Sequence, residues 1–131
     1  MHSGAVHNRA HTDHVRAIQQ ADREGALHFY CAIDEGIVLT LAHPEDMRDN
    51  LVQNMERITE RIGKLDTVLC FDCILRRLEA ERLDLKDDLL PIFDRYNMIG
   101  FNTYGEQYRF LHLSQTLTGL AIGAAPSGGA R

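Results

Sequence analysis

The sequence lacks any apolar run of the length that a membrane-spanning helix needs, about 18 residues or more. Its first nine residues, MHSGAVHNR, have no apolar stretch of the kind found in a signal peptide. Its three cysteines are an odd number and too few for a disulfide scaffold. These absences predict a protein of a reducing compartment, located in the cytoplasm and without a membrane partner.

Basic residues are also scarce, and they do not cluster along the chain. Fourteen Lys and Arg stand against nineteen Asp and Glu, which gives a net charge of −5. Binding to phosphates needs a concentrated basic face, so we expect no nucleic-acid partner. The hydrophobic share of 44% and the charged share of 25% are typical of a soluble globular protein. A length of 131 residues suits one domain.

Composition divides the chain into three parts. Residues 1–13 are polar and rich in histidine, and they predict a flexible lead-in. Residues 123–131 consist mostly of Gly, Ala, Pro and Ser and predict a flexible tail. We expect the single domain to occupy residues 14–122.

The first part of this domain has the pattern of β-strands. Residues 14–20 predict an edge strand, and a turn follows at 21–25. Apolar and other side chains alternate over residues 27–33, as in a half-buried strand. The residues DEG at 34–36 then predict a turn that returns the chain over 37–42 as the second arm of a hairpin.

Two principal helices and further strands are expected in the remainder. Pro44 predicts a helix start, a stripe of apolar residues repeats every three or four positions from Met47 to Ile62, and Gly63 predicts the end. Residues 67–71 are apolar without alternation, which predicts a central strand covered on both faces. Asp72 is expected to cap a helix that begins at Cys73. A helical stretch over 85–96 is expected to break or restart at Pro91.

Strands are expected at 98–103, 109–113 and 115–122. The fold class is therefore α+β, a mostly antiparallel sheet with two principal helices in the order β-β-β-α-β-α-β-β, with some parallel pairing around the strand at 67–71. The expected core consists of Met55, Ile58, Leu69, Phe71, Ile74, Leu78 and Phe101.

Four stretches together resemble one known family. They are GALHF at 25–29 with DEG at 34–36, FDCILRR at 71–77, GFNTYGEQY at 100–108 and HLSQTLT at 112–118. The set resembles the C-terminal half of the FIST sensory domain, named for F-box and intracellular signal transduction proteins. In that family a Phe-x-Cys-x-x-Arg run precedes a Gly-Phe-x-x-Tyr-Gly-Glu run. The resemblance covers residues 14–122.

The resemblance implies a non-enzymatic sensory domain that binds a small ligand in intracellular signal transduction. Some family members bind haem and respond to nitric oxide, so haem is one implied cofactor. The implied signalling partner is a histidine kinase or a cyclic-di-nucleotide enzyme. The candidate ligand-binding residues are Cys73, Arg76, Tyr104, Glu106 and His112, with His112 as the metal ligand only where haem is bound.

Each candidate also has a structural interpretation. Cys70 and Cys73 form a Cys-x-x-Cys, but three residues of strand span about 10 Å, whereas a disulfide needs Cα atoms within about 7 Å. No second ligand pair follows for zinc, so both cysteines are interpreted as buried structural thiols. At a helix N-terminus, however, the Cys73 thiolate would be stabilised by the helix dipole.

Arg76 is expected to pair with Glu106, or alternatively to hold an anionic ligand group. Glu106 could act as a general base, but no nucleophile elbow, phosphate loop or paired-carboxylate motif supports an enzyme. His112 is interpreted either as a structural residue or as a haem ligand.

A second function remains open beside the sensory one. The resemblance lacks the N-terminal FIST half and the opening part of the C-terminal half, and Ser114 stands where many members have Asn. The alternative is a protein-interaction or assembly module without a ligand of its own. A ligand-binding domain requires a polar pocket near the candidate residues. An interaction module requires those residues to pair among themselves and leaves an apolar face exposed. Since the missing half would leave an apolar face uncovered, we expect a homodimer with an interface above about 1,000 Å².

Overall fold

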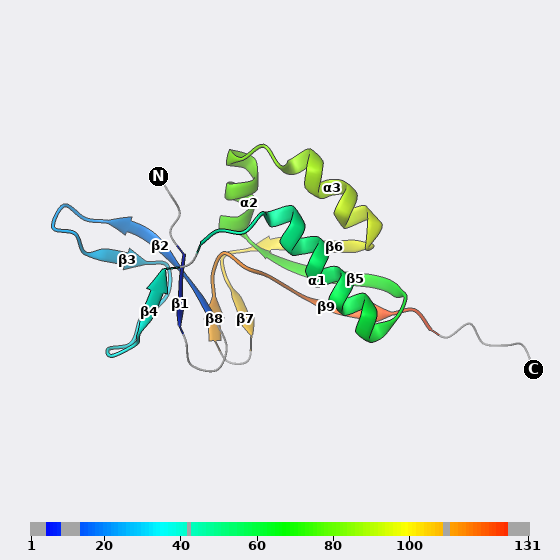
Figure 1. Cartoon of the computed structure of the whole chain (residues 1–131), viewed down its shortest axis with the longest axis horizontal. Coiled ribbons are helices and arrows are strands. Elements are labelled where there is room, and N and C mark those ends of the chain that lie inside the picture. Colours follow the sequence, from blue (N-terminus) through cyan, green and yellow to red (C-terminus); the bar gives the residue numbers. More distant parts are fainter. Residues whose placement is uncertain (1–4, 9–13, 42, 109–110, 126–131) are drawn as a thin grey trace, which may run out of the picture.

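The computed structural model describes residues 5–8, 14–41, 43–108 and 111–125 (Figure 1). Runs of strands at both ends of the described chain flank a central part with three helices, an α+β arrangement that confirms the expected fold class. The elements are, in order, β1 (Ala5–Asn8), β2 (His14–Ala21), β3 (Leu27–Phe29), β4 (Leu39–Leu41), α1 (Met47–Ile62), β5 (Leu65–Cys73), α2 (Ile74–Arg82), α3 (Lys86–Arg95), β6 (Met98–Thr103), β7 (Glu106–Tyr108), β8 (Leu111–Leu113) and β9 (Leu117–Gly123).

The first four strands form an antiparallel sheet in the order β3-β2-β1-β4. β1 lies within residues 1–13, so part of the expected lead-in is a strand. β2 has a neighbour on each side, and its expected place at a sheet edge is therefore wrong. Pairing with β1 gives β2 its second neighbour, and that pairing depends on residues 5–8, where the sequence shows little to bury.

The hairpin expected between residues 27–33 and 37–42 is also wrong. β3 pairs with β2, and β4 pairs with β1, so the two arms never meet as neighbours. The Asp22 side chain causes the change, because it accepts hydrogen bonds from the backbone N–H groups of Glu24 at 2.9 Å and Ala26 at 2.8 Å. Gly25 takes a φ of 91° in the same turn. The tight turn is therefore the one between β2 and β3.

β5 is the middle strand of a second sheet, in the order β6-β5-β9. It runs parallel to β6, with Val68 opposite Met98, and antiparallel to β9, with Val68 opposite Ala121. Parallel neighbours need a long crossover, and α2 with α3 supplies it. The parallel pairing expected around this strand is confirmed. The third sheet is the two-stranded pair of β7 and β8.

Helix ends follow local capping. α1 begins at Met47 rather than at Pro44, because Asp46 is its N-cap and its carboxylate accepts from the N–H groups of Arg48 and Asp49. α1 ends before Gly63, as predicted. Two helices fill the crossover: α2 lies where the helix beginning at Cys73 was expected, and α3 lies within the helical stretch expected over 85–96. α3 continues through Pro91, which stands in its interior, so the expected break is wrong.

The core lies between the β6-β5-β9 sheet and the helices α1 and α3, which pack on one face of it. α1 contributes Leu51 and Met55, and the sheet contributes Val68, Cys70 and Met98. Leu89, Ile92 and Phe93 of α3 pack against the same cluster. In Figure 1 both helices run beside the strands of this sheet. Even-numbered residues of β5 therefore point toward the helices.

The opposite face of the β6-β5-β9 sheet has no helix over it in the described part of the chain. We call it the open face. The strand register places on it Leu69, Phe71, Ile99, Phe101, Leu120 and Ile122.

Several residues that were expected in the core are exposed or only half-buried. Met55 is buried and Ile58 packs against the core, but Phe101 is 62% exposed and Leu78 is 53% exposed. Leu69 and Phe71 are half-buried. The residues of β5 on the open face, Leu69 and Phe71, are apolar like those facing the helices. Because the strand therefore shows no apolar–polar alternation, its sequence predicted that both faces would be covered.

A prediction concerns the close approach of β6 to β5. Any Cβ added at Gly100 would overlap the backbone carbonyl oxygen of Cys70, which cannot move without shifting the central strand. We expect Gly100→Ala to lower the free energy of unfolding by about 3 kcal/mol or more, measured by urea denaturation. Gly36→Asn is the control, because that site is open and Asn tolerates its φ of 84°. Equal losses in the two variants would contradict this packing.

Candidate functional site

The candidate residues Cys73, Arg76 and Glu106 lie where β5 ends and α2 begins. Cys73 is the last residue of β5 and the N-cap of α2, and Arg76 follows in the first turn of that helix. The Arg76 guanidinium donates from Nε to Oδ1 of Asp72 at 2.9 Å. Their side chains are only 13% and 21% exposed, so this ion pair is largely shielded from water.

Asp72 therefore takes the place that Glu106 was expected to fill. Among the described residues, Arg76 and Glu106 share no hydrogen bond or ion pair, and the expected direct pair is wrong. Asp72 and Arg76 are four residues apart across the start of a helix, a spacing that brings their side chains together. Because Asp72 is engaged by Arg76, it does not cap α2, and the N-cap Cys73 makes no side-chain hydrogen bond to the helix.

Glu106 lies at the start of β7 and is almost fully buried, with 3% of its surface exposed. One carboxylate oxygen accepts from the hydroxyl of Thr103, and the other accepts from the hydroxyl of Thr116 at 2.6 Å. These partners come from the end of β6 and from the segment before β9. Glu106 thus ties three segments together, and both of its oxygens are held by protein groups.

The two acids influence each other. Burial raises the pKa of Asp72, the Arg76 cation opposes that rise, and the negative charge of Glu106 adds to it. Burial is the dominant cause, so ionised Asp72 costs the folded state free energy in spite of its arginine partner. The site is a compact polar junction inside the fold.

The cysteines at this junction are buried free thiols. Cys73 has no exposed surface, and Cys70 is 2% exposed in the core below α1. Burial raises the pKa of the Cys70 thiol, the charge of Asp72 raises it further and Arg76 lowers it. A raised pKa disfavours the thiolate that metal binding and nucleophilic attack require.

Tyr104 does not join this junction. Tyr104 is 94% exposed, on the turn between β6 and β7. His112 lies on β8, opposite Gln107 of β7, but its side chain is outside the described residues. Among the residues that the structure describes, no three or more His, Cys, Asp or Glu side chains gather closely enough to hold a metal ion.

Sequence reasoning missed the structural partners of the candidates: Asp72, Thr103, Thr116 and Ser114. Ser114 is fully buried, and its hydroxyl accepts from the backbone N–H of Ala17 at 3.3 Å, which joins β2 to the segment between β8 and β9. Only Asp72 had a sequence signal, its spacing of four residues from Arg76. The other contacts join segments that are distant in the sequence.

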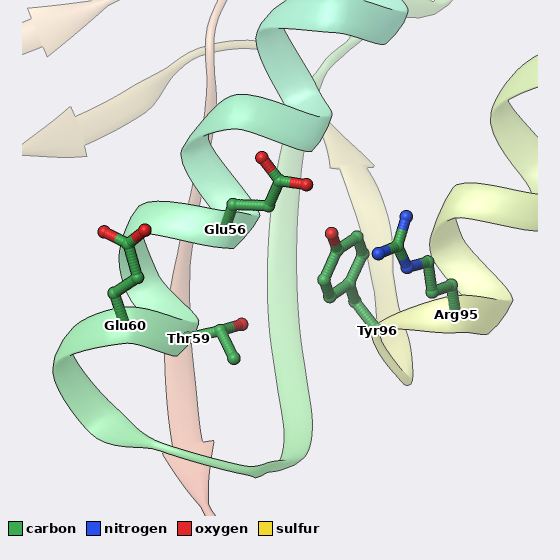
Figure 2. A pocket seen from close by; sticks show the side chains of 5 residues that line it. All are labelled: Glu56, Thr59, Glu60, Arg95 and Tyr96. Atoms are coloured by element: carbon green, nitrogen blue, oxygen red, sulfur yellow. The ribbon is translucent and has the colours of Figure 1, made fainter.

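A separate polar hollow lies between α1 and the end of α3 (Figure 2). It has a volume of about 310 Å³ and is lined by Glu56, Thr59, Glu60, Arg95 and Tyr96. The Tyr96 hydroxyl is buried and has no hydrogen-bond partner among the described residues, while the Arg95 guanidinium stands 5.0 Å from the Tyr96 ring centroid. No candidate residue lines this hollow, so it is not the pocket that the ligand-binding function requires.

Comparison with known proteins was made on the whole chain. A family model described as the FIST C domain matches residues 2–109, well over half of the sequence, and confirms the resemblance. The match includes Cys73, Arg76, Tyr104 and Glu106 but ends before His112. No curated protein and no solved structure matches the chain. Within the described residues, no helix is both long and apolar enough to cross a membrane.

A pH prediction follows from the raised pKa of Asp72. Stability contributed by a carboxyl with a raised pKa is present at low pH and is lost as the pH rises through the folded-state pKa. We therefore expect Asp72→Asn, which keeps an acceptor for Arg76, to gain stability relative to the wild type as the pH rises above about 3.9, the ordinary aspartate pKa. Urea denaturation at a series of pH values measures this difference.

The matched control for Asp72→Asn is Glu81→Gln. Glu81 pairs with Arg77 at the same spacing of four residues, but both side chains are half exposed. Its substitution should leave the pH dependence close to that of the wild type, since an exposed pair contributes little. A difference between Asp72→Asn and the wild type that shrinks as the pH rises would contradict the dominance of burial.

Proposed function

Because the chain belongs to the FIST C domain family, we propose that it is a non-enzymatic module of intracellular signal transduction that passes its signal by protein contact. The open face is the observation that carries this proposal. An exposed apolar surface of this kind on a folded domain marks a site of interaction with another protein. The cytoplasm is the proposed location.

The state of the candidate residues supports contact rather than chemistry. Both oxygens of Glu106 are hydrogen bonded, and its burial keeps a substrate from reaching it as a general base. The Arg76 guanidinium, which could otherwise hold an anionic ligand group, forms an ion pair with Asp72. Pairing within the protein together with an exposed apolar face is the combination that an interaction module requires.

The proposed signalling partner is a histidine kinase or a cyclic-di-nucleotide enzyme, since family members occur with such proteins. Nothing at the open face resembles the basic surface that a nucleic acid would need. Contact through this face would couple the module to the enzyme without any chemistry in the module itself.

The family resemblance also implies a small ligand, with haem and nitric oxide as one form. Of the five candidate residues, Cys73, Arg76 and Glu106 are committed to the fold, and Tyr104 stands in solvent. His112 is the one that could serve as an axial haem ligand, and it would do so from β8.

The contact proposal predicts the effect of polar substitutions on the open face. In the native host, Leu120→Ser should abolish the change in kinase phosphorylation or cyclic-di-nucleotide level that the wild-type chain causes. Leu83→Ser is the matched control, because Leu83 follows α2, away from the sheet, and is about as exposed as Leu120. Unchanged signalling by the Leu120 variant, in a folded protein, would refute contact through this face.

The haem form of the ligand proposal predicts a Soret band when haemin is added to the purified chain. The band should shift with nitric oxide, and His112→Ala should remove it. His28→Ala is the control, because His28 is exposed and pairs only with Asp22 at 3.5 Å. Absence of the band would remove haem from the proposal and leave the contact function standing.

A further inference from the structure

The open face carries no charge across its width. Besides its six apolar residues, the register places Thr67 and Thr118 on the same side of the sheet. Burying this surface therefore desolvates no ionised group, which is the costly part of forming an interface. A charged partner would gain no ion pair here and would lose hydration. An uncharged apolar face is best covered by another uncharged apolar surface. A second copy of the chain has such a surface, its own open face.

The size of the face is adequate for a weak dimer. Ile99 is 60% exposed, Phe101 62%, Leu120 59% and Ile122 47%. Since a large side chain hides on the order of 150 Å² when fully buried, these four residues with Leu69 and Phe71 leave about 400–500 Å² of apolar surface. Two copies together would bury on the order of 800–1,000 Å², which is below the range of about 1,200–2,000 Å² for stable interfaces and within that of weak, transient ones.

The aromatic residues of the face are already arranged for packing. Phe71 and Phe101 lie opposite each other in the register of β5 and β6, with their ring centroids 5.4 Å apart and their planes at 79°. This edge-to-face contact fixes both rings before any partner arrives. Side chains that are ordered in advance lose less conformational entropy on binding, so this pair forms a natural anchor at the centre of an interface.

From the charge, the area and the aromatic pair, and resting on the proposed contact function, we infer that a second copy of this chain covers the open face whenever the signalling partner is not bound to it. The two β6-β5-β9 sheets pack face to face about a two-fold axis, at the spacing of about 10 Å that stacked sheets adopt. Each face then meets itself, and β5 lies at the middle of both layers. An interface of this size is of the weak, transient kind.

Sedimentation equilibrium of the full chain, from about 1 to 200 µM, tests this inference. The wild type should fit a monomer–dimer equilibrium. Phe101→Ser and Leu120→Ser, two exposed positions on different strands, should each raise the dissociation constant at least tenfold. Leu83→Ser should leave it unchanged. Circular dichroism of each variant establishes that the fold is retained.

A wild type that is monomeric throughout this range would overturn the inference, and so would a dimer that neither open-face variant weakens. The outcome is separable from that of the proposed function. A monomer whose signalling still depends on Leu120 would leave the contact function intact, with a different protein on the face. A dimer that the open-face variants dissociate without any loss of signalling would refute the contact function and leave the dimer.

Discussion

The position of β5 between a parallel and an antiparallel neighbour is the constraint on which the rest of the structure depends. A parallel neighbour requires a crossover, and α2 with α3 forms it on one side of the sheet. α1, which precedes β5 in the chain, lies on the same side of the sheet and packs with α3 against Val68 and Cys70. Every helix of the described chain is thus used on one face, and the apolar residues of the other face have no cover within it.

The polar junction at the end of β5 depends on the same arrangement. Where the sheet ends, backbone groups and side chains of β5, β6 and the segment before β9 converge. Asp72 and Glu106 hold these ends through Arg76, Thr103 and Thr116. Burying the Asp72 carboxylate is costly, and its raised pKa reflects that cost, to which the negative charge of Glu106 adds. Arg76 and Glu106, which belong to the family motifs, are thus hydrogen bonded within the protein at this point.

Structure and function therefore meet at the open face. A sheet packed on one side only normally alternates apolar and polar residues along each strand. Here Leu69 and Phe71 alternate with Val68 and Cys70, so both faces of β5 are apolar. α1 and α3 cover one of these faces, and no element of the described chain covers the other. The proposed contact function and the proposed two-fold dimer both rest on that second face.

The sequence by itself determined the local elements whose signals lie within a few residues. The α+β class, the stripe and C-terminal end of α1, the strand at β5 and the family motifs around Arg76 and Glu106 could all be read from it. The tertiary structure alone decided which strands pair, because the turn at Asp22 competes with the one at 34–36 and only the assembled sheet selects between them. It likewise decided that Glu106 meets Thr116, since those partners depend on which segments converge. The contact of Arg76 with Asp72, in contrast, follows from their spacing of four residues. The sequence of an apolar strand indicates only that both of its faces are removed from water. Which elements cover each face depends on the path of the chain in space.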